Sequence, residues 1–206
     1  MVELGTAILW VITTWLVTHF GLANVAVSEI GTWHIVLAII LASLYLLTII
    51  IDYETSLIPD EITITQFVVA WLFLWVCHGQ TVSPNWIDSL IGMVALALFF
   101  FLLALPGWMG LGDVFLAAGF GVIFGWKLVI LVGFLGIFMG GIYGLFLMLY
   151  LMLKGKYKFG TQVPFGPYLA LSAYICLFFG TAILDWYLGL FKLGALSQSA
   201  VSMFGF

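Results

Sequence analysis

The sequence predicts an all-α, polytopic transmembrane helix bundle of about seven hydrophobic segments, within a range of six to eight. Of the 206 residues, 65% are hydrophobic and only 7% are charged, whereas an average soluble domain carries about 25% charged residues. Glu29 is the one charged residue between Leu4 and Ile51, and there is none between Lys127 and Lys154. Because a spanning helix needs about 20 mostly apolar residues, these stretches are long enough to cross a membrane.

Charged residues, prolines and Gly-Trp clusters mark where the hydrophobic segments end. The N-terminus lacks the positive region that opens a signal peptide, so we expect the first segment to be a retained helix. The third and fifth segments are short, and we expect them to be tilted or to begin in a water-filled cavity. No internal repeat or polar linker divides the chain, which predicts one membrane domain over 1–193 and a short tail over 194–206. The seven segments are 4–23, 33–51, 61–77, 86–105, 113–126, 128–153 and 168–190.

Lysines predict the orientation of the chain, because the sequence contains no arginine. The tightest cluster is Lys154, Lys156 and Lys158, directly after the sixth segment. The positive-inside rule places this cluster in the cytoplasm. Counting crossings backward then places residues 52–60 and 106–112, together with the N-terminus, on the same side.

Composition argues against nucleic-acid and metal partners. Nine acidic residues against five lysines give a formal charge of -4, with no basic patch of the kind that nucleic acid requires. Cys77 and Cys176 are isolated in apolar runs, without a CxxC pair or a metal-ligand spacing of the three histidines. We interpret both as buried structural thiols. Membrane lipid is therefore an expected partner, and we expect no metal and no cofactor.

Glycines recur every four residues along the sixth segment, at Gly136, Gly140 and Gly144. Small residues at this spacing let helix backbones approach closely. We expect this stripe to serve helix packing.

Ionisable residues in or beside spanning helices are costly and mark function by default. Asp52 ends a charge-free run, where a carboxylate at a helix C-terminus opposes the macrodipole. Asp113 follows Gly110 and Gly112, which let another chain pass close to it, although its position alone favours an N-cap as the explanation. Asp60 stands directly before the third segment, so we assign it to capping.

Two acids are what aspartyl proteolysis needs, because one carboxylate takes a proton from water while the other, protonated, hydrogen-bonds the scissile carbonyl. Helix ends that face a cytoplasmic cavity would admit that water. A transporter or channel could instead use Asp52 and Asp113 to bind cations or protons, although no inverted repeat supports it. A structural membrane subunit, with the acids as caps, is the third alternative.

Three short motifs together resemble the type IV prepilin peptidases, a family of GxGD-type intramembrane aspartyl proteases. The segment 51–61 is similar to the family's first block, in which an Asp is followed by a hydrophobic residue, Pro and Asp. The segment 110–113 matches the GxGD motif, and 163–170 resembles the later PFGP block. Each motif is weak alone, but the three occur in the family's order, and the resemblance covers about residues 35–190.

This resemblance implies that Asp52 and Asp113 are the catalytic pair of an enzyme that needs no cofactor. It further implies cleavage of leader peptides from prepilin or pseudopilin-like precursors at the cytoplasmic face of the inner membrane. Archaeal preflagellin peptidases and presenilin-like proteases share the GxGD motif, while the PFGP block favours the bacterial type. The residues that the motifs single out in support are Gly110, Gly112, Pro59, Asp60, Pro164 and Gly166.

The sequence departs from the family pattern in two places. Phe115 stands where members commonly carry a lysine two residues after the GxGD aspartate. Many bacterial members also carry a cysteine-containing cytoplasmic domain, associated with N-methylation, after the first segment. Only about ten residues, from Phe20 to Glu29, join the first two segments here. We therefore expect a short form that cleaves without methylating.

Overall fold

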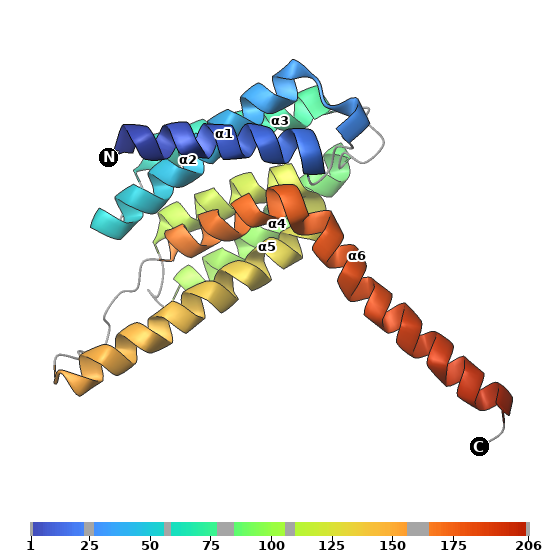
Figure 1. Cartoon of the computed structure of the whole chain (residues 1–206). Helices are drawn as coiled ribbons and strands as arrows, with labels where there is room; N and C mark the ends of the chain where they lie inside the picture. Colours follow the sequence, from blue (N-terminus) through green and yellow to red (C-terminus); the bar gives the residue numbers. More distant parts are fainter. Residues whose placement is uncertain are drawn as a thin grey trace.

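The computed structural model describes residues 2–22, 27–55, 59–77, 85–105, 110–155 and 165–204. Side chains are described as far as Leu190, apart from those of Val2, Glu29 and Cys77. The regular structure in this part of the chain is helical, as predicted, and no strand occurs in it. Figure 1 shows the helices packed side by side in a bundle. The elements are α1 (Val2–Phe20), the short 3-10 helix η1 (Val27–Glu29), α2 (Thr32–Thr55), α3 (Asp60–Cys77), α4 (Trp86–Ala104), α5 (Leu111–Leu153) and α6 (Gly166–Phe204).

Five of the described helices are long and apolar enough to cross a membrane, which confirms the prediction of a polytopic helical membrane protein. They are α1, α2, α4, α5 and the first part of α6, Gly166–Leu190. Their outward surfaces carry large apolar side chains, such as Val11, Ile130 and Phe146. Such faces are stable against lipid, because hydrocarbon tails are as apolar as the side chains.

A sharp bend at Gly125 divides α5 into two helical segments. Gly125 has φ +63° and ψ 179°, a conformation that glycine adopts without the steric cost that a Cβ would add. The predicted fifth and sixth segments are therefore both present, so the described residues contain seven α-helical segments if α5 is counted as two. The predicted boundary at Lys127 was wrong by two residues, because the backbone conformation, and not the charge, sets the bend.

Backbone-to-backbone contact holds α4 against the bend of α5. A Cβ on Gly92 would lie 2.7 Å from the carbonyl oxygen of Gly121 and 2.7 Å from the carbonyl carbon of Gly125. A Cβ on Gly121 would lie 2.4 Å from the backbone of Met93. These distances leave no room for a side chain, so the two helices pack at the closest approach that glycine allows.

The predicted glycine stripe of the sixth segment packs against α6. A Cβ on Gly136 would lie 3.0 Å from Leu169, and one on Gly140 would lie 2.8 Å from the ring of Phe165. The hydroxyl of Ser172 on α6 donates a hydrogen bond to the carbonyl of Val132, at 2.9 Å. The packing role is thus confirmed for Gly136 and Gly140.

The helix directions bring several helix ends to one end of the bundle. The first segment of α5 runs antiparallel to α2, with the Tyr45 and Phe120 rings 5.3 Å apart. The end of α2 and the N-terminus of the chain lie at the same end of the bundle (Figure 1). We call this the Asp52 end. The later part of α6 extends away from the bundle (Figure 1).

Candidate active site

Two acids predicted to act together, Asp52 and Asp113, meet inside the Asp52 end of the bundle. Asp52 lies in the last turn of α2 and Asp113 in the first turn of α5. Only 4% of Asp52 and 8% of Asp113 is exposed. The two carboxyls are close enough for the charge of Asp52 to act on Asp113. Such burial of two acids is costly and requires a compensating role or partner.

One backbone amide holds each carboxyl group. The Gly166 N–H, at the start of α6, donates a hydrogen bond to Asp52. The Gly110 N–H donates one to Asp113. The remaining oxygens, Oδ2 of Asp52 and Oδ1 of Asp113, are buried and have no hydrogen-bond partner among the described residues. Each carboxyl is therefore positioned by one oxygen and leaves the other oxygen available for a reaction.

Asp113 is not the N-cap residue of α5, so its interpretation as an N-cap was wrong. Gly110 is the N-cap residue of α5, with extended backbone and φ -77°. Asp113 is the third helical residue and reaches back to the Gly110 N–H, which is the carboxylate half of a capping box. This bond orients the Asp113 side chain, which also interacts electrostatically with the carboxyl group of Asp52. Gly110 and Gly112 therefore belong to the turn that positions the acid.

The assignment of Asp60 to a helix start is confirmed, although its role as the cap is not. Asp60 and Glu61 are the acids of the first turn of α3, where they complement the macrodipole. The residue before the helix is Pro59, whose carbonyl accepts hydrogen bonds from the N–H groups of Ile62 and Thr63. Pro164 lies outside the described residues. Gly166, the glycine of the PFGP block, is described and lies beside Asp52.

Sequence reasoning missed a set of buried polar side chains deeper in the bundle. Gln66 on α3 is completely buried, and neither its amide nitrogen nor its amide oxygen has a partner in the described chain. Its Nε2 lies 3.5 Å from the place of a Cβ on Gly119. Tyr45 on α2 is buried with its hydroxyl similarly unpartnered. The sequence signal that could have identified Gln66 is that it is a single amide within the apolar run of α3. Polar residues at such places in membrane helices are rare and usually have a functional role.

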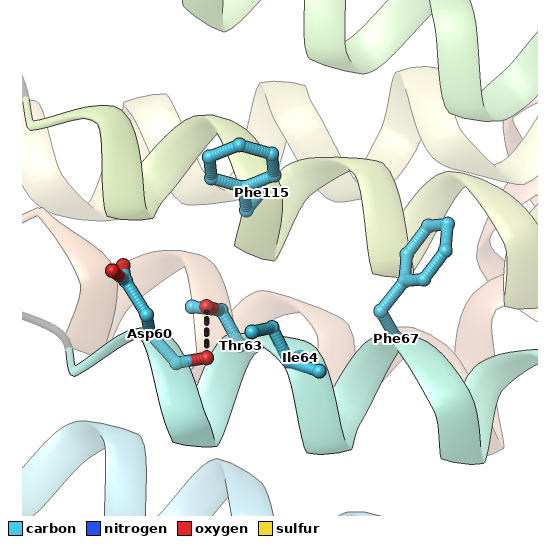
Figure 2. Close-up of a pocket in the computed structure, with 5 residues that line it drawn as sticks. All are labelled: Asp60, Thr63, Ile64, Phe67 and Phe115. Carbon is cyan, nitrogen blue, oxygen red and sulfur yellow. Dashed lines mark hydrogen bonds between the residues drawn. The ribbon is translucent and has the colours of Figure 1, made fainter.

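A pocket of about 380 Å³ lies between α3 and α5, at the same end of the bundle. The side chains of Asp60 and Phe67 reach from α3 toward the part of α5 that carries Phe115 (Figure 2). The Thr63 hydroxyl donates a hydrogen bond to the backbone carbonyl of Asp60, at 2.9 Å, which keeps this polar group inside the helix. The described lining residues are Asp60, Thr63, Ile64, Phe67 and Phe115.

Fold and site together define a helical membrane protein with a buried pair of acids, positioned by the first turns of α5 and α6. Among protein families, the model of the type IV leader peptidase family matches residues 38–145 of this chain, a range that contains both acids. The chain belongs to the type IV leader peptidase family.

Curated relatives carry the name prepilin leader peptidase/N-methyltransferase. The relative from Legionella pneumophila is 30% identical over 91% of this chain and 61% of its own length. The relative from Pseudomonas aeruginosa is 33% identical over 91% of this chain and 60% of its own length. One from Bacillus subtilis is 27% identical over 73% of this chain and 58% of its own length. The chain thus spans about three fifths of the length of these relatives, and no solved structure matches it at a significant level.

Proposed function

We propose that this chain is a membrane-embedded aspartyl endopeptidase that removes the leader peptide from prepilin or pseudopilin-like precursors. The observation that carries the proposal is the buried pair of Asp52 and Asp113, each with one oxygen held by a backbone amide and the other unpartnered. The names of the relatives, which include prepilin leader peptidase, support the substrate class.

The chemistry follows from two carboxyls that share one proton, because ionisation of both at close range is unfavourable. The ionised carboxyl takes a proton from water, and the resulting hydroxide attacks the scissile carbonyl carbon. The protonated carboxyl donates a hydrogen bond to the carbonyl oxygen and stabilises the tetrahedral intermediate. The C–N bond then breaks, and the leaving nitrogen receives a proton from the first carboxyl. Both acids return to their starting state.

The reaction is proposed to take place at the cytoplasmic face of the inner membrane. Lys154 follows the long second segment of α5, and the positive-inside rule favours the cytoplasm for this end. Water is available there, whereas the hydrocarbon core excludes it. A precursor with a cytoplasmic leader and a hydrophobic helix would present the junction between the two at this depth.

Replacement of each acid by its amide tests the proposal. Asp52→Asn and Asp113→Asn are each expected to abolish cleavage of a co-expressed prepilin, because neither half of an acid–base pair acts alone. The readout is the mobility shift of the precursor on a gel. Both variants should insert into the membrane, because Asn fills nearly the same volume and keeps an acceptor for the backbone amide.

Glu54→Gln is the matched control. Glu54 lies on the same helix as Asp52, but its side chain is exposed, so this variant should cleave normally. Near-normal cleavage by either Asp variant, at normal membrane levels, would contradict the assignment of the pair.

A further inference from the structure

The pocket between α3 and α5 combines an apolar wall with a single acid at its end. Phe67, Ile64 and Phe115 supply most of the wall, and Asp60 is the one charged residue among the described lining residues. Asp60 is exposed, and it forms no ion pair within the part of the chain that the structure describes. The acid is therefore free to pair with a cation that an occupant brings.

The order of these groups along α3 matches the order of groups in a precursor of the proposed kind. Asp60 lies at the first turn of α3, whereas Phe67 lies two turns further into the bundle. A precursor whose leader stays in the cytoplasm carries Lys or Arg in front of its hydrophobic helix, by the positive-inside rule. A cation beside Asp60 would place the first apolar residues of that helix against Ile64, Phe67 and Phe115.

The pocket also lies where a membrane-anchored substrate can reach it. Phe115 and Ile64 are largely exposed, so in a membrane they face lipid and not the protein interior. Phe115 is two residues after Asp113 on α5, and about 200° around the helix from it. A helix is about 10 Å wide, so three or four extended substrate residues, at about 3.3 Å each, cover the distance from this face to the acid pair.

We propose that this pocket binds the junction of the precursor, with a basic leader residue on Asp60 and the first apolar residues of its helix on Phe67 and Phe115. The proposal rests on the proposed peptidase function. It assigns Asp60 and Phe115 to substrate selection and not to catalysis.

Photo-crosslinking tests binding independently of cleavage. A photoreactive phenylalanine analogue replaces Phe115 in the full chain, which also carries Asp113→Asn to prevent turnover. This variant is irradiated in membranes together with a prepilin that has a lysine in its leader. A covalent adduct with the precursor is expected. The same analogue in place of Trp126, an exposed residue beside the bend at the far end of the first segment of α5, should give no adduct.

Charge exchange tests the role of Asp60 in a way that a structural role cannot imitate. Asp60→Asn should raise KM about 2- to 5-fold for the lysine leader without changing kcat, which is the range for one exposed ion pair. Asp60→Lys should cleave the lysine leader less efficiently than the wild type does. A leader in which that lysine is replaced by glutamate should restore cleavage by Asp60→Lys. Phe115→Lys, which brings a cation to the same pocket, should shift preference toward the glutamate leader in the same way.

The outcomes separate the pocket from the peptidase function. Cleavage by the wild type without an adduct at position 115 overturns the pocket and leaves the peptidase assignment intact. If Asp60→Lys cleaves both leaders equally poorly, the pocket is likewise overturned and the peptidase assignment stands. Asp60 would then only stabilise the first turn of α3. An adduct at position 115 with no cleavage by the wild type supports the pocket and overturns the peptidase. Loss of both signals overturns both.

Discussion

The backbone N–H of Gly166 hydrogen-bonds the carboxyl of Asp52. This bond joins the start of α6 to the end of α2, two places that are far apart in the sequence. A helix N-terminus carries partial positive charge, so α6 offers Asp52 the stabilisation that its own helix end denies it. The PFGP block thus acquires a physical role beside the first acid, although it contains no acid or base of its own.

The close contact between α4 and α5 predicts a sensitive glycine. Gly121→Ala should lower the stability of the detergent-solubilised protein by about 1–3 kcal/mol, the range for overpacking in a tight core. The new methyl group would collide with the backbone of Met93, which cannot rotate away as a side chain can. Thermal unfolding measures the effect. Gly141→Ala, on the same helix but with open space around its Cβ position, is the control and should not lower the midpoint.

Gln66 predicts a stabilising change. Burial of an amide without a hydrogen-bond partner costs about 1–3 kcal/mol, and Leu has a similar length without polar atoms. Gln66→Leu should therefore raise the thermal midpoint, with Gln66→Glu lowering it because a buried charge costs more. If Gln66→Leu lowered the midpoint instead, the amide would have to be hydrogen-bonded in the membrane. Cleavage measured on the same variant shows whether Gln66 also serves the reaction.

Single introduced cysteines test the orientation. In a background without Cys77 and Cys176, Glu54→Cys and Lys154→Cys are expected to resist an impermeant thiol reagent applied outside intact cells. Trp126→Cys should react, because the bend at Gly125 lies at the end of the bundle opposite the acid pair. Labelling of the first two positions from outside would reverse the predicted topology and place the acid pair on the outer face.

The link between the first two helices predicts a reaction without methylation. α1 ends at Phe20 and α2 begins at Thr32, and the sequence has no CxxC pair. A prepilin processed by the purified 206-residue chain in the presence of S-adenosylmethionine should therefore have the mass of the simple cleavage product. Mass spectrometry measures this directly, and a product heavier by one methyl group would show that the expectation is wrong.

The sequence by itself determined the membrane helices and the two acids of interest. Hydropathy and the spacing of charges are local properties, so the seven segments could be located without knowledge of their neighbours. Asp52 and Asp113 stood out for the same reason, because an acid next to an apolar run is costly wherever the helix packs. The motifs then indicated that these two acids form one site.

Tertiary structure alone decided how that site is built. Gly125 is one glycine among several in α5, and only the packed chain shows that its positive φ makes the bend there. The contact of Gly92 with Gly121 depends on how α4 crosses α5, which no local pattern encodes. The bond from Gly166 to Asp52 and the pocket shared by Asp60 and Phe115 join residues of different helices. Their positions follow from the packing of the whole bundle, because a helix fixes the spacing of its own side chains but not the face that it turns to its neighbours.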